Sequence, residues 1–198
     1  MNIPRQNTEE WRRWRKMKVG ASDAPIILGK SPWTSVGQLW RRKLDLESEQ
    51  PMTAKMQRGV DLEPEALAAF NEYTKAAYEP LVMIHKRFDW CIASLDGWDA
   101  DLRQGLEIKC PGESALRSAE KGQIPSYYIP QLQHQMAVAE LDHIHYWSYD
   151  GKKGTHLICK RDEAFIKHLL EQEAWFYDCL INIVEPTLKY ETEKGAPF

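Results

Sequence analysis

The spacing of apolar residues changes along the chain, from a helical period in the first 75 residues to a period of two afterwards. Apolar positions three or four residues apart predict four amphipathic helices. They span residues 8–17, 22–28, 35–46 and 52–75. Thr8, Ser22 and Ser35 stand where the first three helices would begin, and their hydroxyls suit helix N-caps. Gly59 and Pro64 predict an interruption of the fourth helix, because proline is favoured in a first helical turn and disfavoured later.

Short apolar runs beyond residue 80 predict a sheet. The predicted strands span residues 81–85, 91–95, 106–110, 143–149 and 155–160. Asp150 and Gly151, between the last two strands, are typical of a hairpin turn. Three more helices are predicted, over residues 114–121, from 125 or 130 to about 141, and from 162 to about 184. Elements in this order predict a mixed α/β (α+β) domain built around one central sheet.

The composition fits one intracellular domain. At 198 residues with 43% hydrophobic content, the chain can bury one sizeable core, and no Gly/Ser/Pro-rich stretch divides it. We therefore expect a single domain over residues 1–198, with its core at about 52–160, N-terminal helices within 5–46 and a C-terminal helix at about 162–185. The charged N-terminus suits neither a secretory signal nor a membrane span, so we expect a soluble, cytoplasmic protein with no membrane partner.

Cysteine spacing argues against a zinc or iron–sulfur protein, and the net charge argues against a broadly basic protein that coats DNA. The four cysteines lie far apart without a CxxC pair, which predicts reduced thiols rather than zinc or iron–sulfur ligands. A net charge of -3 gives no overall bias towards nucleic acid, so any DNA contact must depend on local charge. Basic residues cluster at 12–18, 41–43 and 152–153, although such clusters are more often solvated faces than phosphate sites.

The segment most informative about chemistry combines Asp96 with the run Glu107, Ile108 and Lys109. Side chains alternate along a strand, so Glu107 and Lys109 point to one face and Ile108 to the other. If the preceding strand pairs antiparallel, Asp96 at its end approaches Glu107, and the two carboxylates with the Ile108 carbonyl oxygen can hold Mg²⁺. Such an ion acidifies water and offsets charge on a scissile phosphate, while Lys109 orients the nucleophile or stabilises the transition state.

These residues alone leave a second interpretation open. Asp96 and Gly97 also suit a turn, and Glu107 and Lys109 also suit a solvent-facing ion pair on an amphipathic strand. Such pairs are common and stabilise a sheet only weakly. The chemistry of the residues does not decide between the two interpretations.

The order Asp96, then Glu107-Ile-Lys109, resembles the PD-(D/E)xK nuclease superfamily, and within it the lambda exonuclease and YqaJ-type viral recombinase nucleases. The resemblance covers roughly residues 11–180, with four segments in the expected order. They are Val19-Gly-Ala-Ser22-Asp-Ala-Pro-Ile-Ile-Leu-Gly29 preceded by Arg15, Arg58-Gly-Val-Asp-Leu-Glu63-Pro64, Ser94-Leu-Asp96-Gly with Leu106-Glu-Ile-Lys-Cys-Pro111, and Tyr127-Tyr-Ile-Pro-Gln131-Leu-Gln-His-Gln135-Met136.

Besides Asp96, Glu107 and Lys109, the resemblance implies roles for five residues. They are 5′-phosphate binding by Arg15, Ser22 and Ser94, metal binding directly or through water by Glu63, and orientation of water or phosphate by Gln131. Two have ordinary alternatives, since Ser22 suits a plain N-cap and Glu63 suits a first helical turn, where it complements the helix dipole. Gln133 and Gln135 follow on the same helix but, at about 100° per residue, are not expected to share the direction of Gln131.

Other residues carry weaker indications. Asp99 and Asp101 lie in the interval before Glu107, which is slightly longer than in the family, but a hairpin tip is an ordinary place for them. Trp33 follows a proline turn and could stack on unpaired bases, as could Trp40, although core packing is commoner for both. The histidine spacings do not predict a transition-metal centre, because no element carries three ligands: His134, His143 and His145.

The resemblance also implies a fold and an activity. The fold is a restriction-endonuclease-like central mixed sheet flanked by helices. The activity is that of a Mg²⁺-dependent 5′-to-3′ exonuclease, with Mn²⁺ able to substitute, which digests one strand of double-stranded DNA and leaves a 3′ single strand. A homotrimer, a single-strand annealing protein as partner and a phage or prophage gene in a bacterial cell are implied likewise. A site-specific endonuclease of the same superfamily and a catalytically silent DNA-binding module are the alternatives.

Overall fold

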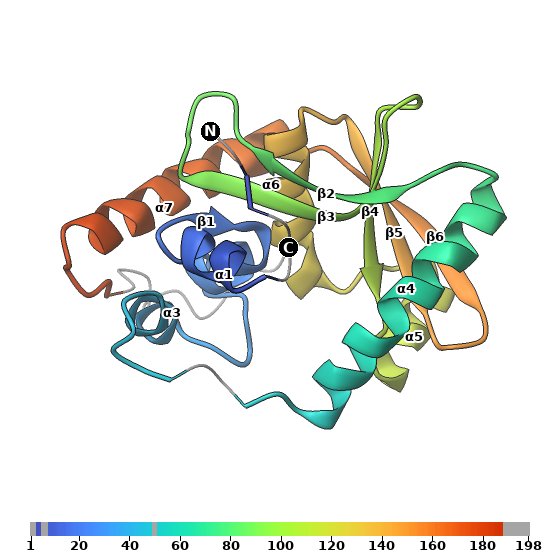
Figure 1. Cartoon of the computed structure of the whole chain (residues 1–198), viewed down its shortest axis with the longest axis horizontal. Coiled ribbons are helices and arrows are strands. Elements are labelled where there is room, and N and C mark those ends of the chain that lie inside the picture. Colours follow the sequence, from blue (N-terminus) through green and yellow to red (C-terminus); the bar gives the residue numbers. More distant parts are fainter. Residues whose placement is uncertain (1–2, 5–7, 49–50, 188–198) are drawn as a thin grey trace.

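A six-stranded mixed sheet forms the centre of the molecule (Figure 1). The structure is a computed structural model and describes residues 3–4, 8–48 and 51–187. Its strands are β1 (Val19–Gly20), β2 (Glu79–Ile84), β3 (Cys91–Asp99), β4 (Gln104–Lys109), β5 (His143–Tyr149) and β6 (Gly154–Lys160). Its helices are α1 (Glu9–Lys16), α2 (Ala24–Ile27), α3 (Val36–Lys43), α4 (Ala54–Thr74), α5 (Glu113–Glu120), α6 (Ile129–Ala139) and α7 (Glu163–Ile181), with 3-10 helices η1 (Ala21–Asp23) and η2 (Ser126–Tyr128). The strand order is β1-β3-β4-β5-β6, and β2 pairs with β3.

Strand β3 has one edge that is only partly paired. Strand β2 lies antiparallel along one edge, over residues 92–98 of β3. The opposite edge pairs in parallel with β1 at residues 91–92 and antiparallel with β4 at residues 97–99. Among the described strands, none pairs with residues 93–96 on this edge, and β4 diverges from β3 there. We call this stretch the β3 gap; it separates the N-terminal segment from β4.

Helices cover both faces of the sheet (Figure 1). Helix α4 packs Phe70 against Leu106 of β4 in one apolar cluster. Helix α6 packs Leu132 with Leu95 and Ile144 in another cluster. Because side chains alternate along β4, the residue after Leu106 faces α6 rather than α4.

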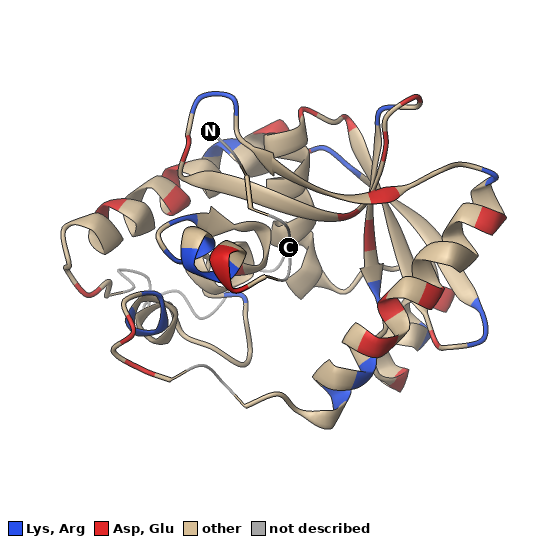
Figure 2. Cartoon of the chain, in the orientation of Figure 1, with Lys and Arg blue, Asp and Glu red and all other residues tan. Residues whose placement is uncertain are grey.

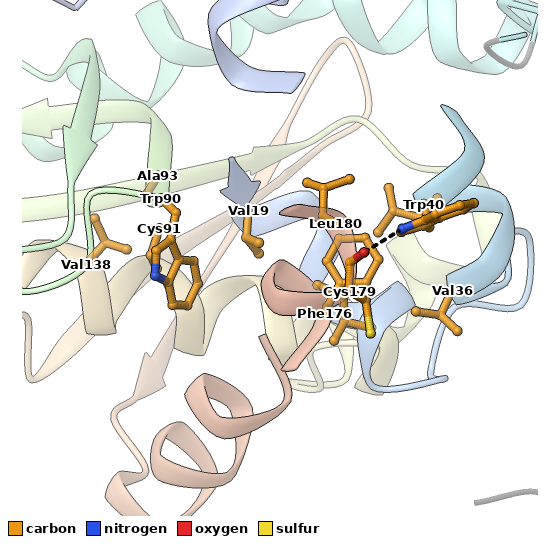
Figure 3. Packing of buried hydrophobic residues seen from close by; sticks show 12 residues of the cluster. Val19, Val36, Trp40, Trp90, Cys91, Ala93, Val138, Phe176, Cys179 and Leu180 are labelled. Atoms are coloured by element: carbon orange, nitrogen blue, oxygen red, sulfur yellow. Dashed lines mark hydrogen bonds between the residues drawn. The ribbon is translucent and has the colours of Figure 1, made fainter. Parts of the chain in front are cut away.

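A third apolar cluster attaches the N-terminal segment to the last helix (Figure 3). Val19 of β1 and Trp40 of α3 share this cluster with Phe176 and Leu180 of α7. The Trp40 indole Nε1 donates a hydrogen bond to the carbonyl oxygen of Cys179 at 3.1 Å. Trp40 is therefore a core residue, and α7 helps to hold β1 and α3 beside the β3 gap.

Helix α4 is continuous, so the interruption predicted from the sequence is wrong. It runs through Pro64 without a break. An interior proline removes one helical hydrogen bond and clashes with the preceding turn, at a cost of about 3 kcal/mol. Contacts on both sides of Pro64 offset this cost, because Arg58 donates to the carbonyl oxygen of Asp150 at 2.6 Å and Glu65 accepts from the Tyr149 hydroxyl at 2.6 Å.

Most other elements lie where the pattern predicts them, with shifted ends. The hairpin of β5 and β6 is confirmed, and α7 ends at Ile181 rather than near residue 184. Strand β3 continues to Asp99 instead of ending at residue 95. Strand β1 was not predicted, because two residues are too few to show a period. Residues 5–7 of the predicted N-terminal helices and 188–198 of the predicted domain lie outside the described residues.

Two expectations from the composition can be compared with the structure. The four cysteines are free thiols, three of them buried, as predicted: Cys91, Cys110, Cys159 and Cys179. Burial raises the pKa of Cys110 and of Cys159 to about 11, so these thiols stay protonated near neutral pH. None of the helices in the described ranges combines the length and apolar character that a bilayer crossing requires.

Candidate active site

Glu107 and Lys109 point to the same face of β4, and α6 covers that face. Glu107 is only 2% exposed, and its Oε1 accepts hydrogen bonds from Lys109 Nζ and from the side-chain amide of Gln131. The Lys109 ammonium also lies 5.2 Å from the ring centroid of Tyr128. Burial lowers the pKa of Lys109, but the charges of Glu107 and Asp96 outweigh burial and raise it. Lys109 is therefore a largely buried cation, with its side chain 23% exposed, and α6 covers the pair rather than solvent.

Asp96 lies in a β-bulge at the β3 gap, not at a strand end as expected. Between two successive ladder pairs, β3 advances three residues, over 95–98, while β2 advances two, over 79–81. The Asp96 carboxylate accepts a hydrogen bond from the backbone N–H of Ile108 at 2.8 Å. A side chain of β3 thus contacts β4 where the backbone ladder has stopped. This contact brings Asp96 to the residue next to Glu107.

Three carboxylates share this region with one ammonium group. Glu63 lies in the middle of α4 rather than at a helix start, and it interacts electrostatically with Glu107 and Lys109. Burial, and then the charge of Glu107, raise the pKa of Glu63; the same two causes raise the pKa of Asp96 well above its ordinary range. Excess negative charge on hard carboxylate oxygens fits a divalent cation such as Mg²⁺.

The carboxylates do not form a finished metal cage. Within the described residues, Asp96, Glu107 and Glu63 do not bring three ligand atoms within 4.8 Å of one another. Side-chain donors occupy both oxygens of Glu107, and a backbone N–H occupies one oxygen of Asp96. A carboxylate has about four lone-pair positions, so each group retains positions for a cation.

Two glutamines of α6 reach Glu107, although the sequence pointed only to one. Gln131 donates to Oε1 of Glu107, and Gln135 donates to Oε2. The expectation that Gln135 points elsewhere is wrong, because four residues at about 100° each return to nearly the same side of a helix. Gln133 does point elsewhere and donates to the carbonyl oxygen of Lys160 at 2.8 Å.

Asp99 ends β3, and Asp101 lies in the turn that joins β3 to β4. One oxygen of Asp99 accepts from the N–H groups of Asp101 at 3.0 Å and Leu102 at 2.8 Å, and the other accepts from the N–H of Ala77 at 3.0 Å. These backbone hydrogen bonds lower the pKa of Asp99. The longer interval before Glu107 is therefore accommodated by a hydrogen-bonded turn.

Arg15 and Ser22 lie together on the other side of the β3 gap. The Arg15 guanidinium donates to the Ser22 hydroxyl at 3.3 Å and stacks 4.5 Å from the ring centroid of Trp11. The expectation that Ser22 caps a helix is wrong, because it lies within η1 and its exposed hydroxyl makes no capping hydrogen bond. The carboxylate of Asp23 instead accepts from the N–H of Gly20 at 2.9 Å.

A buried ion pair beneath Ser22 leaves the charge of Arg15 available. Lys43 contacts the carboxylate of Asp23 at 2.8 Å, and both side chains are about 8% exposed. Burial raises the pKa of Asp23, but Lys43 and Arg15 outweigh burial and lower it. Because Lys43 already neutralises Asp23, Arg15 can attract a further anion. Half-buried Ser94 lies in the β3 gap, two residues beyond the β1 pairing.

A cleft of about 1140 Å³ joins the two sides of the gap. Ser22 lines one part of it and Gln131 another, while Asp96 and Glu107 do not line it. Trp33 and Tyr127 line the cleft too, with ring centroids 5.3 Å apart in an edge-on contact. Trp33 is 64% exposed, so its expected core packing is wrong.

Most of the clustered basic residues form ion pairs with acids of the same chain. Figure 2 shows that basic and acidic residues are interspersed over the elements. Arg41 and Arg42 both contact Glu47, and Lys153 contacts Glu120. The basic clusters at residues 41–43 and 152–153 are therefore solvated or ion-paired faces, as runs of basic residues usually are.

A separate buried group, Cys91, His134 and Glu173, does place three metal-type ligand atoms within 4.8 Å. Both ring nitrogens of His134 are engaged, Nδ1 with Glu173 Oε1 at 2.7 Å and Nε2 with the carbonyl oxygen of Ile92 at 2.8 Å. Burial lowers the pKa of His134, but Glu173 outweighs burial and raises it well above its ordinary value. The geometry is that of a hydrogen-bonded contact joining α6 to β3 and α7.

Comparison of sequences relates the whole region to one family. The family profile described as YqaJ-like viral recombinase domain matches residues 10–142, which include every predicted site residue from Arg15 to Gln131. The uncharacterized protein YqaJ of Bacillus subtilis (strain 168) is 26% identical over 179 residues, or 86% of this chain. The chain spans only 55% of the length of that relative.

Comparison of structures confirms the expected nuclease fold, a central mixed sheet flanked by helices. An alkaline exonuclease, LHK-Exo from Laribacter hongkongensis, matches with a TM-score of 0.76 and 28% identity over 90% of this chain and 95% of its own. The structure of LHK-Exo in complex with dAMP matches equally well. A phage-related exonuclease from Haemophilus somnus 129PT shares the fold, with a TM-score of 0.61 and 16% identity over 84% of this chain and 96% of its own.

Proposed function

Because the chain belongs to the YqaJ-like viral recombinase domain family, we propose that it is a Mg²⁺-dependent exonuclease that hydrolyses double-stranded DNA from its ends. One observation carries this proposal: the buried pair of Glu107 and Lys109 lies beside Asp96 where β3 and β4 separate. Carboxylates with raised pKa values, here Asp96 and Glu63, next to a largely buried cation are typical of catalytic sites. The matched LHK-Exo is an alkaline exonuclease, which supports the same reaction class here.

In the proposed site, Asp96, Glu107 and the main-chain carbonyl of Ile108 hold Mg²⁺, and Glu63 joins them directly or through water. Mn²⁺, which also accepts oxygen ligands, substitutes for it. When bound, the ion supplies an acidified water and offsets the negative charge of the scissile phosphate. Lys109, kept charged by its carboxylate neighbours, orients the attacking water and stabilises the charge that develops on the phosphate. Gln131 lines the cleft and contacts the water or the phosphate.

The proposed polarity is 5′ to 3′, and it rests on the pocket across the β3 gap. Arg15 and the exposed Ser22 hydroxyl offer a charged and a neutral donor to a terminal 5′-phosphate, with Ser94 as a third donor. An end held there places the first phosphodiesters in the cleft that Gln131 lines. Trp33 projects into the same cleft and is proposed to stack on bases of the separated strand.

The proposed product is a 3′ single-stranded overhang that a single-strand annealing protein uses in phage-type recombination. We propose a homotrimer as the acting form, located in the cytoplasm of a bacterial cell and encoded by a phage or prophage. A closed ring would retain DNA by topology, so a subunit with a net charge of -3 would not need a broadly basic surface.

Digestion of matched DNA substrates tests the proposal. Wild type is incubated with linear and covalently closed circular duplexes, with and without Mg²⁺, and the linear duplex carries either 5′-phosphate or 5′-hydroxyl ends. We expect Mg²⁺-dependent loss of the linear duplex alone, with the 5′-phosphate preferred and the 3′-ended strand left intact. Arg15→Ala should lose that preference by about tenfold or more, because a charge-assisted hydrogen bond is lost. Cleavage of closed circles would favour the endonuclease instead.

A further inference from the structure

Gln135 joins the two strands of the site across the β3 gap. It is fully buried in α6, one helical turn after Gln131. Its amide nitrogen donates to Oε2 of Glu107 on β4 and, at 3.3 Å, to the carbonyl oxygen of Ser94 on β3. Within the described strands, β3 and β4 pair through their backbones only at residues 97–99 of β3, so Ser94 has no backbone partner on β4. The side-chain amide therefore replaces a ladder contact.

The orientation of this amide follows from its neighbours. A glutamine amide has a nitrogen with two donors and an oxygen that only accepts. Glu107 and the Ser94 carbonyl both offer acceptors, so the nitrogen must face them and the oxygen must face away. That oxygen, Gln135 Oε1, is buried without a hydrogen-bond partner in the described part of the chain.

The unpartnered oxygen argues against a purely structural role. Burying a polar atom without a partner is unfavourable, so such atoms are rare in native proteins. An apolar side chain of similar length, like the neighbouring Met136, would fill the space without that cost. The donor groups of Gln135 are thus the feature that explains glutamine at this position.

The consequence for Glu107 is that both of its oxygens are fixed. Lys109 and Gln131 hold Oε1, while Gln135 holds Oε2, so the carboxylate cannot rotate freely. Groups that hold a metal ligand from behind set its orientation, and their loss weakens metal binding by about 10- to 100-fold. Gln135 occupies such a place behind Glu107.

We propose that Gln135 is a positioning residue that fixes the Glu107 carboxylate, and the spacing of β3 and β4 at the gap, for a divalent cation. This inference rests on the proposed function. It gives a role to a residue that the sequence left without one: Gln135 lies in the same segment as Gln131 but was expected to point in another direction.

Three variants separate positioning from packing. Gln135→Met keeps the length of the side chain and removes its donors, whereas Gln135→His keeps an N–H donor at a similar place. Gln133→Met is the matched control: Gln133 is also buried on α6, but it bonds to the carbonyl oxygen of Lys160 at 2.8 Å and to the N–H of Asp162 at 2.9 Å, away from the site.

Binding of Mn²⁺ to the DNA-free protein, followed by electron paramagnetic resonance, is the first measurement, and the melting temperature is the second. We expect Gln135→Met to bind Mn²⁺ about tenfold more weakly, with a melting temperature lowered no more than that of Gln133→Met. Gln135→His should regain most of the affinity. Gln133→Met should melt at a lower temperature and bind Mn²⁺ like wild type.

Two results would overturn the inference. One is wild-type Mn²⁺ affinity in Gln135→Met; the other is an equal loss of affinity in Gln135→Met and Gln133→Met, which would indicate general destabilisation. If wild type itself neither binds Mn²⁺ nor digests DNA, the proposed function fails, and this inference fails with it. An active wild type with an unaffected Gln135→Met refutes the positioning role alone.

Discussion

Among single residues, the strongest effects come from charges that are buried together. Lys109 stays protonated because Glu107 and Asp96 offset its burial, while Asp96 and Glu63 hold protons more tightly because burial, and then the charge of Glu107, raise their pKa values. A bound cation would neutralise the negative charge of these carboxylates in place of the protons. The same residues therefore explain both the electrostatic imbalance of the protein alone and its expected affinity for Mg²⁺.

Lys109→Met should abolish most activity without unfolding the protein. Loss of one charge-stabilising donor from an active site costs about 100- to 1000-fold in kcat. Single-turnover digestion of linear duplex at saturating Mg²⁺ measures this loss, with Lys153→Met, a largely exposed lysine, as control. Activity of Lys109→Met within a few-fold of the control would remove Lys109 from the mechanism.

The sequence identified the residues of the site better than their neighbours. Asp96, Glu107, Lys109 and Gln131 follow from a motif that the structure brings together. Gln135 was missed although helix geometry alone places it on the side of Gln131. Ser22 and Glu63 were both expected at helix starts. Ser22 instead lies within η1 and Glu63 in the middle of α4, because tertiary contacts set where these helices begin.

At the scale of elements, continuity of α4 and the short β1 are the features that local patterns could not predict. A proline at residue 64 predicts a helix break, but packing of Phe70 against the sheet and the contacts of Arg58 and Glu65 with β5 and its following turn hold the helix on both sides of it. Strand β1 exists because it pairs with β3, a partner about 70 residues away. Non-local pairing of this kind also creates the β3 gap.

Pro64→Ala should stabilise the protein, because it restores a backbone donor inside α4 and removes the clash with the preceding turn. The expected gain in the free energy of unfolding is about 1–3 kcal/mol. Urea denaturation measures it, with the exposed Glu72→Ala as a control expected to change stability by less than about 0.5 kcal/mol. A loss of stability in Pro64→Ala would mean that the proline shape is required by the fold.

At the scale of the whole molecule, one sheet carries the catalytic candidates on one side and a histidine network on the other. His145 of β5 lies 2.7 Å from His156 and 3.1 Å from Gln104, both measured between hydrogen-bonding atoms. Burial, and then the nearby His156, lower the pKa of His145 to about 4. These histidines are neutral structural groups near pH 7.

Acid should therefore remove the stability that depends on a neutral His145. Between about pH 6.5 and 4 the unfolded chain binds a proton at residue 145 that the folded chain does not, so the contribution of His145 to stability falls as the pH falls through this window. Asp96 and Glu63, with raised pKa values, act in the opposite direction, so the contribution of His145 is measured by difference from a variant. His134, with a raised pKa, contributes fully below pH 6.5 and does not offset the loss. Urea denaturation at several pH values should show a shallower pH dependence in His145→Gln than in wild type. Equal slopes would contradict the assignment of this loss to His145.

The most direct measurement is Mg²⁺-dependent release of nucleotides from linear duplex DNA by wild type, Glu107→Gln and Glu173→Gln. Both glutamates are buried and accept hydrogen bonds from α6, but only Glu107 belongs to the proposed site. We predict that Glu107→Gln loses activity by at least about 100-fold, while folded Glu173→Gln keeps it. Wild-type activity in Glu107→Gln, or an equal loss in both variants, would contradict a nuclease site built on Asp96, Glu107 and Lys109.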